Sequence, residues 1–320
     1  MKNIILLLAI SFGLIACQKA TEKTTEAVTA SASAEGQEQN FTLEASLKLL
    51  SSDSLAGRET GTVGIEKAAD HIEQVFKKFN VQPYLETYKD SFQVKTQTAY
   101  NVVGMVKGSK PELKPIMIGA HYDHIGYGKV VDNDSIANGA NDNATGTVAV
   151  LELAKHFSEN QPKRSVIFAL FSAEEKGLLG AEHLAERFSK EAITPYFLFN
   201  IEMIGIPMNG KNYKAYLTGI EKSNFAQVFN TASEASVVGF LPEAQKMGLF
   251  KRSDNYPFYE VLNIPAHTVC TFDFTNFKYY HHVDDEFDKM DLKHLKSLIN
   301  SFKSGLTNLA NTTKDEIKLN

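Results

Sequence analysis

Residues 116–146 combine an apolar run, a polar loop and the start of a helical pattern. The run Ile116–Ala120 is apolar, and the chain turns polar at His121–His124. A loop rich in glycine and asparagine follows, and apolar residues recur at helical spacing after Gly146. In open α/β sheets, ligands bind beyond the carboxyl ends of the strands. This stretch therefore predicts an α/β fold with a polar site at that edge, and its imidazole and carboxylate groups together suit zinc.

The composition of the whole chain narrows the classes of protein to consider. The 320 residues suffice for one large domain, and 43% of them are hydrophobic, so a full core is expected. The net charge of −5 gives no support to nucleic-acid binding. With only two cysteines, Cys17 and Cys270, no disulfide framework is indicated.

The N-terminal residues have the pattern of an export signal. Lys2 precedes an apolar segment, Ile4–Ile15, which is too short for a comfortable membrane span. The four residues Leu14–Cys17 resemble the bacterial lipoprotein box, in which the cysteine is lipidated; an ordinary secretory signal with a stray cysteine is the alternative. We expect a lipoprotein signal peptide over residues 1–17, ending at lipidated Cys17, and a flexible tether over 18–40. The chain would then be exported and lipid-anchored to a bacterial membrane, at the outer membrane or periplasmic face.

Strand and helix patterns alternate from residue 41 onward. Strands are predicted at 84–94, 100–106, 116–120, 166–171, 196–201 and 266–271, and helices at about 43–50, 65–79, 178–188, 222–235 and 291–309. The run at 166–171 is apolar throughout, as expected of a strand covered on both faces. The pattern predicts a single domain with a mostly parallel central sheet and helices on both faces.

Acidic or histidine residues recur where the apolar runs end. They are His121 and Asp123, Glu174 and Glu175, Glu202 and His281, and Asp142 lies in the loop before a helix. Each cluster alone has an ordinary explanation: a solvated loop, a turn former or a charge that favours a helix N-terminus. Their repetition at one edge of one sheet is hard to explain by solvation, and it favours a functional site.

These segments resemble the motifs of the di-zinc aminopeptidase family, which also includes glutamate carboxypeptidase, transferrin-receptor ectodomains and glutaminyl cyclase. The resemblance spans residues 41–309 and is carried by Gly119–His124, Gly139–Gly146, Ser172–Gly180, Asn200–Gly205 and Tyr280–Asp285. It implies a zinc-exopeptidase fold of the phosphorylase/hydrolase-like type, with residues 41–320 as the catalytic domain and two zinc ions as cofactors.

The resemblance also implies a role for each polar residue. The metal ligands would be His121, Asp142 as the bridging carboxylate, Glu175, Glu202 and His281. Glu174 would be the general base, and Tyr280 would donate its hydroxyl to the oxyanion. Asp123 would orient the imidazole of His121 from behind.

Three positions need separate comment. The family has aspartate where this chain has Glu202, so the geometry and the metal preference there are open. His282 stands where the family has threonine, which leaves a choice of ligand between His281 and its neighbour. Arg252 lies in a segment that resembles the substrate cleft, and either a substrate contact or a surface arginine is consistent with its position.

The resemblance implies a metal-dependent exopeptidase, an aminopeptidase that removes N-terminal residues from peptide substrates by means of a metal-bridging hydroxide. A glutaminyl cyclase with one zinc, a non-catalytic binding module on the same fold and a chain with merely solvated loops are the alternatives. His121 together with His281 favours two metals, and Glu174 favours an enzyme, since a binding module needs no base. Carboxypeptidase action stays open too. Five phenylalanines between residues 250 and 277 suggest an apolar specificity pocket, although most are expected in the core.

Overall fold

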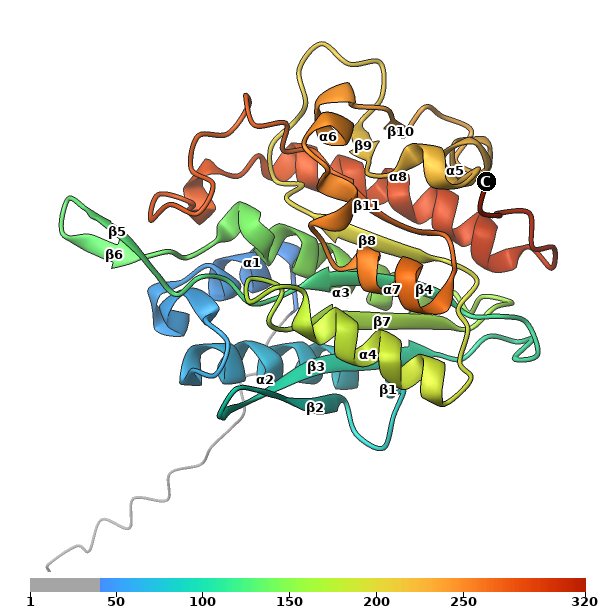
Figure 1. Ribbon diagram of the computed structural model, residues 1–320, viewed down its shortest axis with the longest axis horizontal. Coiled ribbons are helices and arrows are strands. Elements are labelled where there is room, and N and C mark those ends of the chain that lie inside the picture. Colours follow the sequence, from blue (N-terminus) through green and yellow to red (C-terminus); the bar gives the residue numbers. More distant parts are fainter. Residues whose placement is uncertain (1–40) are drawn as a thin grey trace, which may run out of the picture. The chain divides into compact units, whose positions relative to one another are not determined.

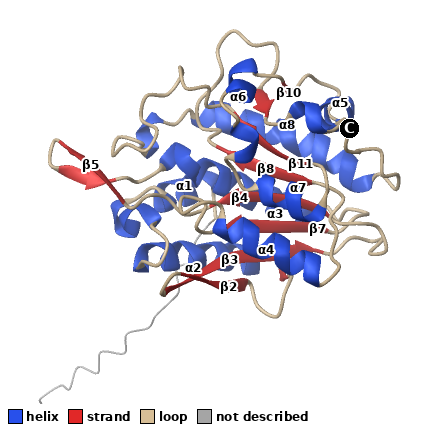
Figure 2. Ribbon diagram, viewed as in Figure 1, coloured by secondary structure: helices blue, strands red, loops and turns tan. Residues whose placement is uncertain are grey.

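A central sheet of nine strands lies between two layers of helices (Figures 1 and 2). The computed structural model describes residues 41–320; residues 1–40, with the predicted signal peptide and tether, lie outside the described residues. The arrangement confirms the predicted fold class.

The strands of this sheet are β1 Gln82–Pro83, β2 Lys89–Val94, β3 Gln97–Val106, β4 Ile116–His121, β7 Val166–Phe171, β8 Leu198–Glu202, β9 Ala215–Leu217, β10 Val238–Gly239 and β11 Ala266–Cys270. The order is β1-β3-β7-β4-β8-β11-β9-β10, with β2 also paired to β3. The four central strands, β7, β4, β8 and β11, are parallel to one another. Antiparallel pairs occur only toward the two sides, at β3 and at β9. The carboxyl ends of the four central strands therefore meet at one edge.

The helices are α1 Leu43–Leu50, α2 Val63–Lys78, α3 Thr145–Glu159, α4 Leu179–Lys190, α5 Phe225–Ala232, α6 Pro242–Lys246, α7 Asn255–Leu262 and α8 Leu292–Asn311. Alternate strand residues reach opposite layers: Ile116 and Ile118 pack with α2, α3 and α8, whereas Met117 packs with α4 and α7. Both faces of the central strands are thus buried, which explains why their sequences are continuously apolar. Figure 1 shows α4 and α7 on one face, with α2, α3 and α8 on the other.

The structure differs from the predicted elements in two places: the start of one strand and a hairpin that was not predicted. The strand expected at 84–94 begins only at Lys89; Tyr84 lies in the preceding loop, with its ring 5.6 Å from that of Phe188. A hairpin of β5 Tyr127–Val131 and β6 Asp134–Ile136 was not predicted. Its strands carry no buried residue, and their few apolar positions do not alternate as in a strand packed on a core. Asp132 and Asn133 both have positive φ, as a two-residue hairpin turn requires.

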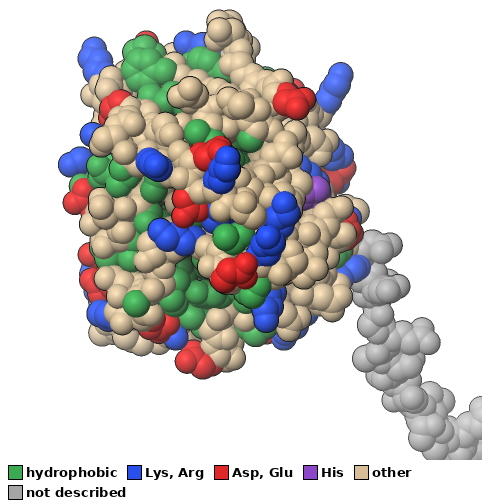
Figure 3. Space-filling view, turned by 90° about the vertical axis from the view of Figure 1, so that its right-hand side faces the viewer, with side chains coloured by type: hydrophobic (Ala, Val, Ile, Leu, Met, Phe, Trp, Pro, Cys, Tyr) green, Lys and Arg blue, Asp and Glu red, His purple; other side chains and the backbone are tan. Residues whose placement is uncertain are grey.

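The surface gives two further observations. On the face drawn in Figure 3, acidic and basic side chains lie among one another rather than in blocks of one sign. Within residues 41–320, no helix combines the length and the apolar character that a membrane crossing needs.

Arg58 is a fully buried cation that joins three segments near the carboxyl end of β4. Its Nε donates to the carbonyl of Tyr122 at 2.8 Å, and its Nη2 donates to that of Gly139 at 2.9 Å. Its Nη1 donates to the carbonyls of Leu50 and Asn138. Burial lowers the pKa of Arg58 to about 10, so the side chain still carries its charge at neutral pH. The guanidinium of Arg58 therefore anchors the loop between β6 and α3.

Replacing Arg58 with methionine should lower the free energy of unfolding by about 3 kcal/mol or more, since each buried carbonyl left without a donor costs about 1–3 kcal/mol. Urea denaturation of the full chain measures the change. Lys190→Met is the control, because the Lys190 side chain is 74% exposed in a surface ion pair. Equal stability of the two variants would contradict the structural role of Arg58.

Candidate metal centre

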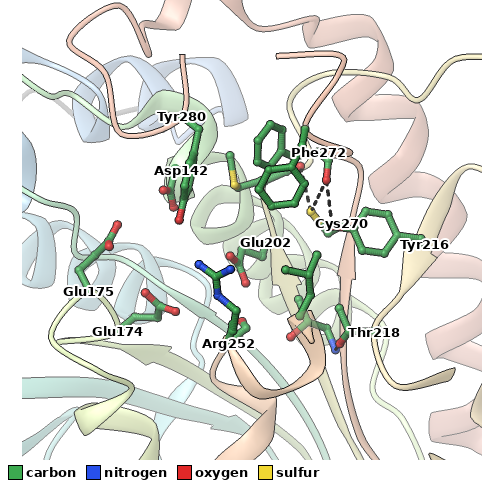
Figure 4. A pocket seen from close by; sticks show the side chains of 15 residues that line it. Asp142, Glu174, Glu175, Glu202, Tyr216, Thr218, Arg252, Cys270, Phe272 and Tyr280 are labelled. Atoms are coloured by element: carbon green, nitrogen blue, oxygen red, sulfur yellow. Dashed lines mark hydrogen bonds between the residues drawn. The ribbon is translucent and has the colours of Figure 1, made fainter. Parts of the chain in front are cut away.

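The predicted site residues converge at the carboxyl edge of the parallel strands. His121 is the last residue of β4, Glu202 is the last residue of β8, and Glu174 and Glu175 follow β7. His281 arrives from the loop between β11 and α8. Because β7, β4 and β8 are adjacent and parallel, these side chains face a shared space. Figure 4 shows the carboxylates of Glu174, Glu175 and Glu202 and the side chain of Asp142 turned toward it.

Asp142 lies between two histidines. Its Oδ1 is 3.4 Å from Nε2 of His121, and its Oδ2 is 3.3 Å from Nε2 of His281. The second histidine is also 3.2 Å from Oε2 of Glu175. A carboxylate that turns one oxygen to each of two imidazoles has the arrangement that a ligand shared by two metal ions needs.

The loop that carries Asp142 is held by side chains of its own. Asn141 Oδ1 accepts from the backbone N–H of Gly205 at 2.9 Å, and Asn143 Oδ1 accepts from that of Met203 at 3.1 Å. Asn143 Nδ2 also donates to the carbonyl of Ile201 at 2.9 Å. The peptide bond between Asp142 and Asn143 is cis. The asparagines therefore bind the loop to the end of β8, which fixes Asp142 relative to Glu202.

Asp285 positions Asp142 from the other side, a role that the sequence analysis did not assign. Its two carboxylate oxygens accept from the backbone N–H groups of Asn141 at 2.8 Å and Asp142 at 3.0 Å. Burial raises the pKa of Asp285 to about 7, with these two hydrogen bonds opposing the shift. In the sequence, this role of Asp285 was indicated only by its position at the end of the segment Tyr280–Asp285.

Asp123 has more partners than the predicted one. Its Oδ1 is 3.7 Å from Nδ1 of His121, which lies nearer to the Asp123 carbonyl, at 3.2 Å. The carboxylate also accepts from the backbone N–H groups of Glu174 at 3.1 Å and Glu175 at 3.3 Å, and from the hydroxyl of Thr60. Asp123 therefore orients the loop after β7 as well as facing His121.

The donor set fits metal ions. Burial raises the pKa of Glu174 well above its ordinary value and that of Glu202 to about 7. Asp142 Oδ2 and His121 Nε2 are buried and have no hydrogen-bond partner among the described residues. Carboxylates gathered away from water are costly unless cations accompany them. Imidazole and carboxylate ligands at these separations are those that zinc takes in proteins.

A cleft opens beside the carboxylates of Asp142, Glu174, Glu175 and Glu202. Leu249, Cys270, Phe272 and Phe274 form an apolar wall. Of the five phenylalanines considered for a pocket, Phe272 and Phe274 line the cleft, whereas Phe250, Phe258 and Phe277 are buried and do not. The expectation that most of them belong to the core is confirmed.

Tyr280 lies at the edge of the cleft, and its ring stacks on Phe272 with centroids 5.4 Å apart. Burial and the neighbouring carboxylates raise the pKa of its hydroxyl above the ordinary value. The group therefore stays protonated and can donate a hydrogen bond.

Arg252 reaches into the same cleft and is drawn between Glu174 and Glu202 in Figure 4. The other three arginines of the chain are bound to carbonyls or carboxylates. No hydrogen bond or ion pair occupies the guanidinium of Arg252 among residues 41–320. It is therefore available to a ligand in the cleft.

Two other residues beside the site had no predicted role. His124 is fully buried, and with Asp142 and Glu175 it forms a group whose ligand atoms all lie within 4.8 Å of one another. Asp254 is fully buried, and neither of its carboxylate oxygens has a hydrogen-bond partner within the described part of the chain. Burial raises the pKa of Asp254 well above its ordinary value.

The vacuolar membrane protease of Schizosaccharomyces japonicus is 28% identical over 219 residues, which is 68% of this chain and 24% of that protein. The chain spans between 22% and 24% of the length of the first curated relatives that it matches.

Two solved structures share the fold. The zinc aminopeptidase BSAP from Bacillus subtilis has a TM-score of 0.66 and 15% identity, with 85% of this chain and 95% of that chain covered. The glutaminyl cyclase from Fimbriiglobus ruber has a TM-score of 0.63 and 19% identity, with 83% and 94% covered. At these sequence identities, the similarity shows a shared fold and nothing more.

The expectation of a lipid-anchored location at a bacterial membrane is wrong. The relatives that overturn it are eukaryotic: the protease of S. japonicus and a vacuolar membrane protease of Kluyveromyces lactis. The lipoprotein-box resemblance of Leu14–Cys17 is a four-residue pattern, which carries little weight beside matches of this length. The segment itself lies outside the described residues.

The predicted family is confirmed by a match over most of the chain. Residues 101–302 match the sequence pattern of peptidase family M28, and this range contains every residue assigned to the metal centre. The chain belongs to peptidase family M28.

Proposed function

We propose that this chain is a zinc-dependent aminopeptidase that removes N-terminal residues from peptides. The observation that carries the proposal is the position of Asp142, with one oxygen turned to His121 and the other to His281. A single shared carboxylate between two imidazoles suits a pair of metal ions. Glu174 lines the adjoining cleft.

The ligands divide into two groups around Asp142. His121 and Glu202 would hold one zinc with Oδ1 of Asp142, and Glu175 and His281 would hold the other with Oδ2. Glu202 replaces the aspartate of the family at the end of β8, so its carboxylate reaches one methylene further into the site. His281 rather than His282 faces the carboxylates: Nδ1 of His282 accepts from the backbone N–H of Asp284 instead.

The side chains around the cleft supply the other steps of hydrolysis. Bound zinc would polarise the scissile carbonyl and lower the pKa of a water molecule. Glu174 would take the proton of the attacking water and pass it to the leaving amine, a transfer that a raised pKa favours. Tyr280, kept protonated, would donate to the oxyanion.

A free substrate amine would be held by the carboxylates at the rim of the cleft. The substrate side chain would then lie against the apolar wall of Leu249, Phe272 and Phe274. The fold shared with the zinc aminopeptidase of B. subtilis supports this choice.

The direct test measures zinc content and peptide cleavage on the same purified chain. We expect two zinc ions per chain and release of the N-terminal residue only from peptides with a free amine. Glu174→Gln should keep both metals and lose at least about 100-fold in kcat, since it removes the base and leaves the ligands. Glu182→Gln, on the exposed side of α4, is the matched control and should cleave normally.

Other outcomes point to other functions. One zinc per chain with cyclisation of N-terminal glutamine would replace the proposal with a glutaminyl cyclase. Two metals without cleavage of any peptide would indicate a binding module. Release of C-terminal residues would indicate a carboxypeptidase.

A second prediction concerns Arg252, whose guanidinium would bind a carbonyl or carboxylate of the peptide. Arg252→Met should lower kcat/KM by about 10- to 100-fold, mostly through KM, since a hydrogen bond to a charged group contributes about 1.5–3 kcal/mol. Lys251→Met is the control: its ammonium lies 5.2 Å from the centroid of the Tyr256 ring, and the residue does not line the cleft. Steady-state kinetics on one peptide compare both variants. An unchanged KM in Arg252→Met would remove Arg252 from the substrate contacts.

A further inference from the structure

His124 lies on the Glu175 side of the metal centre. Its Nδ1 is 3.1 Å from Oε1 of Glu175 and 3.7 Å from Oδ2 of Asp142. Its Nε2 is buried and has no hydrogen-bond partner among residues 41–320. The polar contacts of this imidazole are thus all made by Nδ1, and they are all with residues assigned here to one metal ion.

The separations between these atoms match the edges of a zinc coordination shell. Ligands at about 2.0–2.2 Å from tetrahedral zinc lie about 3.3–3.6 Å from one another. Nε2 of His281 is 3.3 Å from Oδ2 of Asp142 and 3.2 Å from Oε2 of Glu175. With the two distances from His124, four of the separations among the four residues fall between 3.1 and 3.7 Å; His124 faces Oε1 of Glu175, and His281 faces Oε2.

The ring of His124 is fixed in this position by the chain around it. Gly139, at φ +57°, lies against the ring, and a Cβ there would be 2.6 Å from its Cγ and Cδ2. The carbonyl of Gly139 accepts from Arg58, so the backbone beneath the ring is held in turn. The backbone N–H of His124 donates to the carbonyl of Arg58 at 3.3 Å. The rings of His124 and His281 lie edge to face, with centroids 5.6 Å apart.

We infer that His124 is a fourth protein ligand of the zinc ion held by Asp142, Glu175 and His281, bound through Nδ1. This inference rests on the proposed function for the presence of that metal. The two metal positions then differ: one has four protein ligands, and the other has three, namely His121, Asp142 and Glu202. Zinc sites with four protein ligands are closed, whereas catalytic sites keep a position for water or substrate. The four-ligand position would fill first and bind more tightly.

A different role for His124 must be separated from this one. With a proton on Nδ1, the ring would donate a hydrogen bond to Glu175 and only orient it. An asparagine side chain places an N–H close to where Nδ1 lies, so His124→Asn keeps that donor and lacks the imidazole ligand. His124→Ala removes both.

The experiment measures zinc affinity by chelator competition on the metal-free full chain and the visible spectrum of the cobalt-loaded chain. Loss of an ordinary supporting hydrogen bond lowers metal affinity by about 10- to 100-fold. We expect both His124→Asn and His124→Ala to weaken one of the two metal equivalents by more than about 100-fold, and to change the cobalt spectrum of that equivalent. His282→Asn is the matched control, since that imidazole lies beside His281 without facing the carboxylates, and it should keep both affinities.

Two results would overturn the inference. If His124→Asn retains wild-type affinity and spectrum, His124 only orients Glu175. If both variants retain them, the ring has no part in metal binding. Should His124→Ala fail to fold, His124→Asn alone still decides. Because neither readout uses turnover, two bound metals without peptide cleavage would refute the proposed activity and leave the role of His124 to be decided by affinity.

Discussion

The gathering of carboxylates in a buried space is the constraint on which the rest of this structure depends. Asp142 is buried, Glu174, Glu175 and Glu202 are half-buried around the same cleft, and such a gathering of carboxylates is unfavourable without cations. Part of the compensation comes from the protein. Arg58 is a buried charge whose field acts on Asp142, Asp123 and Glu175. Its hydrogen bonds go to backbone carbonyls, so the guanidinium does not occupy the oxygens of these carboxylates.

The sheet makes this gathering possible because it brings distant residues to one edge. His121, Glu174 and Glu202 are far apart in the sequence, but they follow adjacent parallel strands. The register between β4 and β7 pairs His121 with Phe171, so the loop with Glu174 starts level with the end of β4. The register between β8 and β11 pairs Glu202 with Cys270 in the same way. A slip of one residue would turn each of these side chains to the opposite face.

The fold class, and the gathering of polar residues at one edge of the sheet, could be predicted from the sequence because both depend on local patterns. Continuous apolar runs predicted the central strands, and the polar residues that ended them marked the edge. The residues that were missed act over long distances. Arg58 lies 81 positions before Gly139, and Asp285 lies 144 positions after Asn141. In sequence, Arg58 belongs to a turn. The roles of Arg58 and Asp285 exist only in the folded chain, since each acts on backbone groups that carry no side-chain signal.

The backbone departs from ordinary conformations beside the carboxylates and imidazoles that gather at this edge of the sheet. Ala173 before Glu174, Met203 after Glu202, and His281 itself all have φ between 47° and 59°. A side chain in this region costs about 1 kcal/mol or more, and such strain tends to occur at functional sites. Hydrogen bonds offset it: the Met203 N–H donates to Asn143, and the Met203 carbonyl accepts from the Thr271 hydroxyl at 3.0 Å. The asparagines and threonines beside the ligands therefore have a physical purpose. Asn143 and Thr271 hold the end of β8 in a bent conformation beside Glu202, which is turned toward Asp142.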